Sequence, residues 1–400
     1  MVVQTIKPEY KQTEVGVIPK EWDIDKIENL ASITTGSKNT QDKIDDGEFP
    51  FFVRSQKVER INTWSFDGEA VLTAGDGVGT GKVFHYINGK FDFHQRVYKI
   101  SNFSNRIDGR FFYSYFSNNF LRRIMSMTAK SSVDSVRMDM IAEMLVPLPE
   151  KNEQREIAKA ISDAGILIES LDNLIEKKKR LKQGALQELL TGKKRLSGFL
   201  GEWKLETLGS LGSFSKGKGL PKKDISSSGK LRAIPYTAIY TDFNEVIKHE
   251  EIKNLTSSNE TAIIDSPRLL IAGSSNMLEN VGKVTAFHSY LKVAIGGDII
   301  IYKTSEDVRF ISYLLNTQTH RKKIIRLSQG STIRHVYAST FENYEIKVPN
   351  NQEQTAIAQV LSDMDAEIEE LEHKRDKYKQ TKTGMMQQLL TGKTRLKWKN

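Results

Sequence analysis

Two stretches of the chain repeat apolar residues at helical spacing. Between 157 and 175 apolar side chains follow one another at steps of three or four residues, and the same rhythm recurs between 357 and 389, where Arg375 and Lys382 break it. The seam positions are Ile157, Ile161, Ile168 and Leu171 in the first stretch, and Ile357, Leu361, Ile368 and Leu371 in the second. So narrow a stripe is typical of a coiled coil. With Gly192 and Gly392 as natural helix ends, each predicted helix is roughly 55 Å long.

The regions before these helices have a different pattern. Short β-branched runs, among them "AVLTAG", "KVFHYI", "RVYKIS", "RLLIAG", "KVTAF" and "DIIIYK", are bounded by Gly, Asn and Asp and predict strands. Helical patterns follow them at 111–126 and at 310–327. Each region therefore predicts a mixed α+β globule that precedes one long helix.

The chain is an internal duplication. Residues 153–196 align with 353–396 without a gap and share 21 of 44 positions, including "LLTGK" in both copies. A second offset, of 181, places "EWDIDKIENLASITTG" (21–36) over "EWKLETLGSLGSFSKG" (202–217). The middles share little, apart from "GKV" at 81–83 and 282–284. Two copies are too few for a solenoid, which needs at least three.

These patterns predict an α+β protein with a pseudo-two-fold internal repeat. Two mixed α/β globules are separated by two long helices, which pair antiparallel as a coiled coil if a two-fold axis relates the halves. The expected division is a first globule at 1–150, a helix at 151–196, a second globule at 197–350 and a helix at 351–400. Such an arrangement is a spacer between two unlike globules. It suits a long, quasi-symmetric ligand such as DNA, whose half-sites lie a helical turn or so apart.

Composition and charge narrow the class of protein. There is no cysteine, which excludes disulfides and thiolate zinc sites and fits a reducing compartment. No apolar run approaches the roughly 20 residues that span a bilayer, so we expect a cytoplasmic protein with no membrane partner. Lys and Arg number 59 against 50 acidic residues, a net charge of +9. A polyanion is the natural partner of a basic chain, although many basic proteins bind no nucleic acid.

The order of these elements resembles a known family. The chain has, in order, a variable globule, a "Q-x-x-I-A" helix, an "LLTG" end, an "EW" start, and a second globule and helix. This order, like the opening segment "TEVGVIPKEW" (13–22), is similar to the specificity subunit of type I restriction-modification systems. The resemblance covers the whole chain. It implies two target recognition domains, each reading one half of a bipartite double-stranded DNA site. It also implies helices that set the spacing and dock two methyltransferase subunits, joined by a translocating endonuclease subunit.

The sequence offers no pattern typical of a catalyst. No Pro-Pro pair occurs, so the Asn/Asp-Pro-Pro-aromatic motif expected of an adenine methyltransferase is absent. "AGDGVGTGKVF" (74–84) fails as a phosphate-binding loop, because Asp76 stands at the first glycine position and Val83 at the hydroxyl position. We interpret it as a glycine-rich hairpin. The seven histidines show no metal spacing, so we expect no metal, no cofactor and no enzymatic activity.

Candidate DNA contacts come from basic, hydroxyl and amide side chains in loops, since these groups bind phosphates and base edges. Matching polar segments precede the last strand of each globule, and the two glycine-rich loops and a lysine-rich segment (215–224) add further candidates. The predicted residues are Thr80, Lys82, Lys130, Ser131, Ser132, Ser135 and Arg137 in the first globule, and Lys216, Lys218, Lys222, Lys223, Ser274, Ser275, Asn276, Arg326, Gln329, Ser331, Thr332, Arg334 and His335 in the second. The alternative is that these are only solvated loops.

Two further interpretations stay open at this point. "EKKKRLK" (176–182) lies inside the first long helix, where its lysines could face DNA, an acidic partner surface or only water. Trp22 and Trp203 occupy matching places and are expected to anchor each globule by packing. The main alternative function is a coiled-coil interaction scaffold that binds no DNA. A third possible function, a self-sufficient modification enzyme, is disfavoured because its motifs are missing.

Overall fold

The computed structural model describes residues 6–127, 135–226, 228–258 and 260–396. The chain divides into two compact units, one made of 1–172 and 373–400 and the other of 173–372. Each unit contains one globule, the first part of the long helix that follows it and the last part of the other long helix. Within the described residues, no helix is both apolar and long enough to cross a bilayer.

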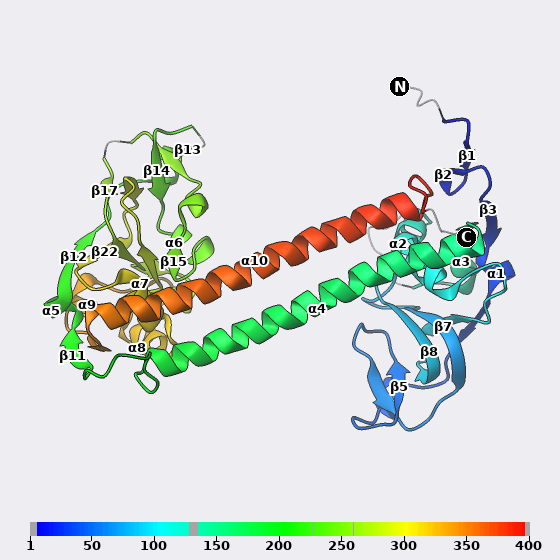
Figure 1. The fold of residues 1–400 in the computed structure, drawn as a ribbon, viewed down its shortest axis with the longest axis horizontal. Coiled ribbons are helices and arrows are strands. Elements are labelled where there is room, and N and C mark those ends of the chain that lie inside the picture. The colour runs from blue at the N-terminus through cyan, green and yellow to red at the C-terminus, as the bar shows by residue number, and fades with distance from the viewer. Residues whose placement is uncertain (1–5, 128–134, 227, 259, 397–400) are drawn as a thin grey trace. The chain divides into compact units, whose positions relative to one another are not determined.

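Unit 1 is built on one antiparallel-rich sheet of six strands in the order β4-β9-β7-β8-β5-β6. Its centre is the long hairpin of β7 and β8, drawn in blue in Figure 1. Among the described strands of this sheet, β5 and β8 pair in parallel and the other neighbours pair antiparallel. The strands are β4 (Ser32–Thr35), β5 (Phe49–Phe52), β6 (Glu59–Ile61), β7 (Phe66–Ala74), β8 (Phe84–Phe93) and β9 (Val97–Ser101).

Helix α2 (Gly109–Ser126) covers this sheet because one side of it is aromatic. Phe112, Phe116 and Phe120 stack along α2 with ring centroids 5.3 and 4.5 Å apart, and all three are fully buried. Asp108 caps the helix by accepting from the backbone N–H groups of Arg110 and Phe111. The remaining elements are β1 (Tyr10–Thr13), β2 (Gly16–Pro19), β3 (Asp23–Lys26), α1 (Ile27–Leu30), η1 (Thr40–Asp42), α3 (Met138–Ala142) and β10 (Leu145–Leu148).

Unit 2 contains two five-stranded sheets, β12-β22-β18-β20-β15 and β13-β16-β14-β21-β17. The division arises because the equivalent of the long strand β8 is interrupted at 288–292, which separates β20 from β21. The strands are β12 (Gly212–Lys216), β13 (Ile225–Ser226), β14 (Leu231–Ile234), β15 (Val246–Ile247), β16 (Leu255–Thr256), β17 (Ala262–Ile264), β18 (Arg268–Ala272), β20 (Val284–Phe287), β21 (Val293–Ile295) and β22 (Ile299–Thr304).

The helical pattern at 310–327 forms two helices rather than one. Helix α7 (Val308–Asn316) and helix α8 (Gln318–Leu327) are separated at Thr317, whose backbone is extended. The Asn316 side chain bonds both the N–H and the C=O of Val284, which ties the end of α7 to the sheet. The other elements of unit 2 are β11 (Lys204–Thr207), α5 (Leu208–Leu211), η2 (Lys222–Asp224), α6 (Ala238–Thr241), η3 (His249–Glu251), β19 (Ser274–Ser275), β23 (Arg334–His335), α9 (Ala338–Glu342) and β24 (Glu345–Val348).

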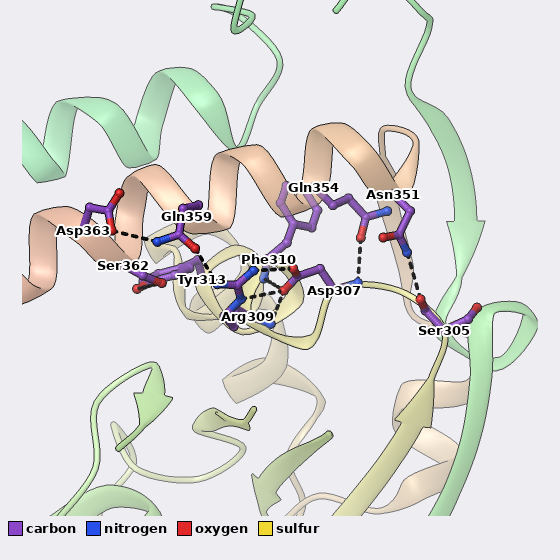
Figure 2. A network of polar contacts seen from close by, with 10 residues as sticks. All are labelled: Ser305, Asp307, Arg309, Phe310, Tyr313, Asn351, Gln354, Gln359, Ser362 and Asp363. Atoms are coloured by element: carbon purple, nitrogen blue, oxygen red, sulfur yellow. Dashed lines mark hydrogen bonds and ion pairs between the residues drawn. The ribbon is translucent and has the colours of Figure 1, made fainter. Parts of the chain in front are cut away.

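A buried glutamine attaches the start of each long helix to its globule. In α4 (Lys151–Leu189), Gln154 accepts from the Asp108 N–H at 2.8 Å and donates to the Pro149 carbonyl. In α10 (Asn351–Leu389), Gln354 accepts from the Asp307 N–H at 3.2 Å, beside the Arg309–Asp307 pair that opens α7 (Figure 2). A buried amide with no partner would cost free energy, so this glutamine specifies the docking. The repeated "Q-x-x-I-A" motif is therefore an anchor.

The repeated "LLTGKxRL" motif attaches the end of each long helix to the opposite globule. In unit 1, Leu389 and Leu390 are buried in the same core as Trp22, where α4 also begins (Figure 1). Past the turn at Gly392, Arg395 pairs with the fully buried Glu153, which also accepts from the Trp22 indole at 3.1 Å. The motif thus ends one helix and attaches it to the start of the other.

Unit 2 repeats this arrangement with the roles of the helices exchanged. Leu189 and Leu190 are buried in the core that also holds Ile357 and Leu361. Arg195 makes a bidentate contact of 2.5 and 2.5 Å with Glu353, which is fully buried. Trp203 packs against this core, and Trp22 is completely buried in the other, so both tryptophans are packing anchors, as predicted.

The two long helices run antiparallel within each unit. In unit 2, Lys178 pairs with Glu367 at 2.5 Å and Lys182 with Asp365 at 2.5 Å. In unit 1, Arg375 pairs with Asp172 at 3.5 Å. Three lysines of the "EKKKRLK" segment are therefore paired with carboxylates of α10, the third being Lys179 with Glu372. These ion pairs between the helices are partly buried, and they fix the register of α4 against α10.

The predicted seam residues fall into two groups. Ile157 and Ile161, like Ile357 and Leu361, belong to the globular cores, because the first turns of each helix are packed inside a globule. Leu171 and Ile368 are buried although neither belongs to a globular core, and Ile168 and Leu371 are half-buried. Burying a side chain of this size contributes about 1.5–3 kcal/mol.

Candidate nucleic-acid interface

In unit 1 the glycine-rich loop lies against the segment that precedes the last strand. The loop connects β7 to β8, which pair antiparallel, so the predicted hairpin is confirmed. The Val136 N–H donates to the Gly75 carbonyl at 2.7 Å, and Asp76 forms an antiparallel bridge with Ser135. Two segments about sixty residues apart in sequence therefore present one edge of the globule.

Unit 2 builds the same edge from different residues. The Val336 N–H donates to the Gly273 carbonyl at 2.9 Å, which matches the Val136–Gly75 bond. Next to it, β19 pairs antiparallel with β23, so that Ser274 faces His335. The backbone frame is thus common to both globules although the intervening sequences share little.

The structure places most of the predicted contact residues at the surface. The exposed ones are Lys82, Ser135, Arg137, Lys216, Lys218, Lys222, Lys223, Asn276, Arg326, Gln329, Ser331 and Thr332. Arg334 and His335 are half-buried. Lys130, Ser131 and Ser132 lie outside the described residues. Ser135 and Lys82 lie in the two segments that form the edge of unit 1. Asn276, Gln329 and His335 lie in the two segments that form the matching edge of unit 2.

Three predicted hydroxyls are buried and support the loops. The Thr80 hydroxyl donates to the Gly77 carbonyl at 2.7 Å, and the Ser274 hydroxyl donates to Asp298 at 3.1 Å. The Ser275 hydroxyl accepts from the Met277 N–H at 3.0 Å. Their expected role as surface contacts does not fit this geometry, because each of these hydroxyls is buried and already paired within the protein. Arg334 is likewise engaged, with Ser328 and the Gly330 carbonyl.

Sequence analysis missed a charged cluster on the edge of unit 1. Arg54, at the end of β5, and Arg96, before β9, both pair with Asp76 of the glycine-rich loop, at 2.7 and 3.1 Å. Beside them the Gln95 amide donates to Asn39 at 2.6 Å. No local motif could have revealed these groups, because they come from four separate segments that only the sheet brings together.

His94 fixes the backbone of this cluster. Its Nδ1 accepts from the Arg96 N–H at 2.9 Å. Burial lowers the pKa of His94, and the nearby Arg54 guanidinium lowers this pKa further. The ring is therefore neutral at neutral pH, with its proton on Nε2, which is the form that can accept at Nδ1.

The corresponding edge of unit 2 borders a groove of about 880 Å³. Lys222, Tyr236 and Asp298 line it, together with the backbone of Gly296 and Gly297. Lys216 approaches Asp298 at 3.5 Å. The groove therefore offers cationic, aromatic and acceptor groups side by side, which suits recognition of a nucleic-acid surface.

The prominent charged groups are engaged in pairs that orient them, as Arg54 and Arg96 are by Asp76. Among the described residues, no three His, Asp or Glu side chains gather where they could hold a metal ion. The arrangement presents hydrogen-bond donors and acceptors in fixed positions, which is what base and phosphate recognition requires.

Comparisons with known proteins agree with this geometry. The sequence model described as "Type I restriction modification DNA specificity domain" matches residues 19–180 and 201–377. The chain is 30% identical to the type I restriction enzyme EcoDI specificity subunit of Escherichia coli over 181 residues, which are 44% of this chain and 39% of that one. It is 22% identical to the MjaVIII specificity subunit of Methanocaldococcus jannaschii over 99% of both chains.

A solved structure has the same fold. The crystal structure of the type I restriction-modification system S subunit from M. genitalium superposes with a TM-score of 0.66 at 16% identity, over 96% of this chain and 98% of that one. The expected fold class, with two mixed α/β domains and two long helices in an internal repeat, is therefore confirmed.

Proposed function

Because the chain belongs to the family of type I restriction-modification DNA specificity proteins, we propose that it chooses the DNA sequence on which a type I complex acts. Each globule reads one half of a bipartite double-stranded site. We divide the chain into recognition domains at 1–150 and 197–350 and spacer helices at 151–196 and 351–400. The chain supplies recognition, and the methylation and cleavage chemistry belongs to partner subunits.

One observation carries this proposal. The two globules keep one backbone frame at the edge formed by Gly75 and Val136 or by Gly273 and Val336, while the side chains on that edge differ. A constant frame with variable polar groups is the arrangement expected when two domains recognise two unlike sequences, since base readout depends on the side chains and positioning on the frame. A scaffold with no DNA function has no need of it.

The helices have the second role. Each is continuous over 39 residues and rises about 58 Å at 1.5 Å per residue. The ion pairs Arg395–Glu153 and Arg195–Glu353 fix the ends of the helices, so neither helix can slide relative to the globule that holds its end. We propose that they fix the number of base pairs between the half-sites and dock two methyltransferase subunits, which an endonuclease and translocase subunit joins.

A domain exchange tests the proposal. Residues 37–148 are replaced by the equivalent segment of another family member, and the methylated or bound motif is determined for both complexes. Only one half of the bipartite motif should change. A change in both halves, or in neither, would contradict the assignment of one half-site to each globule. A gel-shift series against random duplexes tests the alternative function, because an interaction scaffold would select no sequence, alone or with partners.

A further inference from the structure

The charged cluster on the edge of unit 1 places two arginines on one carboxylate. Asp76 Oδ1 accepts from Arg54 Nη1 at 2.7 Å, and Asp76 Oδ2 contacts Arg96 Nη1 at 3.1 Å. The arginine side chains are 44% and 62% exposed, whereas that of Asp76 is 20% exposed. The carboxylate therefore lies beneath the two guanidinium groups, and these point toward the solvent.

The backbone beneath the cluster fixes both arginines relative to the loop. The Gly75 N–H donates to the Arg96 carbonyl at 2.8 Å. A Cβ at Gly79 would lie 2.5 Å from the Arg54 carbonyl oxygen, so the loop packs against Arg54 as only a glycine permits. The sheet and the loop thus set the backbone positions of the two arginines, and the Asp76 carboxylate orients their guanidinium groups.

Guanidinium groups held in this way are suited to guanine. Each of them donates one N–H to Asp76, and within the described residues no other hydrogen bond engages the rest of its five donors. The planar fork of arginine matches the O6 and N7 acceptors of guanine in the major groove, and a carboxylate that already orients the fork reduces the entropy lost on binding. A phosphate contact would need the positive charge but not the orienting carboxylate, which offsets part of that charge.

Unit 2 carries different chemistry at the same three places. The register of the parallel pairs β5–β8 and β14–β21 makes Phe52 equivalent to Ile234, so Tyr236 stands where Arg54 does. The bond from Gly273 N–H to the Asp298 carbonyl makes Asp298 the equivalent of Arg96, and Ser274 that of Asp76. Unit 1 therefore has two donors and an acceptor at these places, whereas unit 2 has an aromatic ring, an acceptor and a hydroxyl.

We propose that Arg54 and Arg96, oriented by the Asp76 carboxylate, read guanine in the half-site bound by unit 1. The corresponding edge of unit 2, with Tyr236 and Asp298, does not read guanine at the matching place. Asp76 is a positioning residue that acts through the two arginines. This inference rests on the proposed function, because it takes the edge of unit 1 to face DNA bases.

The test is a selection from a duplex pool in which both half-sites are randomised, with the full chain copurified with its methyltransferase subunits. The wild-type complex should select at least one guanine in the half-site that the 37–148 exchange identifies. Arg96→Ala should lower the preference for one guanine about tenfold and leave the other half-site unchanged. Arg96→Gln should move the preference at that position from guanine to adenine, which a merely structural role of Arg96 would not do.

Two matched variants give the comparison. Asp76→Asn should weaken the preference for guanine while keeping overall binding to non-specific duplex, because both guanidinium groups remain. Asp298→Asn, at the equivalent place of Arg96, should change only the half-site of unit 2. Circular dichroism of each variant against the wild type detects loss of fold before the selections are compared.

The outcomes separate the inference from the proposed function. A half-site without guanine, or arginine variants that weaken all sequences equally and reduce the salt dependence, would make the arginines phosphate contacts and overturn the inference alone. Unchanged selection by both arginine variants would overturn it too. A wild-type complex that selects no sequence at all would overturn the proposed function together with the inference.

Discussion

The Arg395 guanidinium lies on the Glu153 carboxylate, 2.8 Å from Nη2 to Oε2, although the two residues are 242 positions apart. Glu153 lies in the first turn of α4 and Arg395 follows α10, so this contact joins the start of one long helix to the end of the other. Glu153 is completely buried, and the pKa of Arg395 is raised chiefly by its hydrogen bond to that carboxylate. The equivalent pair in unit 2 is Arg195 with Glu353.

Arg395→Ala should destabilise unit 1, because it leaves the buried Glu153 carboxylate without its cation. Breaking one partner of a buried pair costs about 3–5 kcal/mol, and the partial exposure of Arg395 places the expected loss of unfolding free energy near the lower value. Urea denaturation of the full chain measures it. Lys159→Ala, which removes an exposed ion pair with Asp163, is the control and should leave the stability almost unchanged. Equal effects of the two variants would refute a structural role for the Arg395–Glu153 pair.

Two glycines of the C-terminal helical region should respond to alanine in opposite directions. Gly392 has φ of +66°, and a Cβ there would lie 2.5 Å from the Pro19 ring. Gly392→Ala should therefore destabilise unit 1 by at least about 1–2 kcal/mol. Gly384 lies within α10 with open space around it, so Gly384→Ala should stabilise by about 0.5–1 kcal/mol. Thermal unfolding of the two variants beside the wild type checks both signs, and destabilisation by Gly384→Ala would contradict the helix interior described here.

Lengthening both helices by one heptad should widen the recognised site. Seven residues inserted after Asp172 in α4 and after Glu372 in α10 keep the heptad phase and add about 10 Å, or about three base pairs at 3.4 Å each. The half-sites themselves should stay unchanged in a duplex selection. A seven-residue Gly/Ser insertion beside the exposed Leu200, outside both helices, is the control. Equal spacing in all three proteins would disprove the proposal that the helices fix it.

Asp307 should make unit 2 sensitive to acid. Burial alone would raise the pKa of Asp307, but the Arg309 guanidinium and the backbone N–H groups of Arg309 and Phe310 more than offset this, so the pKa lies below its usual value. A carboxyl whose pKa is lower in the folded state stabilises the fold above its unfolded pKa, about 3.9, and this stabilisation is lost as the pH falls through the folded pKa.

Comparing Asp307→Asn with the wild type isolates that contribution. The difference in urea midpoint should be greatest near pH 5 and shrink as the pH falls below about 4. Asp45→Asn, at a side chain that is 94% exposed, should show no such trend. A constant difference between Asp307→Asn and the wild type at every pH would show that Asp307 acts only as a helix cap.

The sequence by itself determined the duplication, the long helices and the six strands at the centres of the two main sheets, β7, β8, β9, β18, β20 and β22. Apolar spacing and the identities between 153–196 and 353–396 are local properties, so α4, α10 and the ends at Gly192 and Gly392 could be predicted directly. Strands such as β7 and β18 follow from β-branched runs for the same reason. The break of 310–327 at Thr317 was not predictable, because it depends on the bonds of Asn316 to the sheet.

Only the tertiary structure decided which side chains share the recognition edge. Sequence favoured loops rich in hydroxyls, yet Thr80, Ser274 and Ser275 are buried. The hydroxyls of Thr80 and Ser275 pair with backbone groups of their own turns, and that of Ser274 pairs with the distant Asp298 carboxylate. Arg54 and Arg96 meet at Asp76 through strand pairing across long sequence separations. The common frame of the two globules was hidden for the same reason: backbone hydrogen bonds define it, and these constrain the side chains of an exposed edge very little.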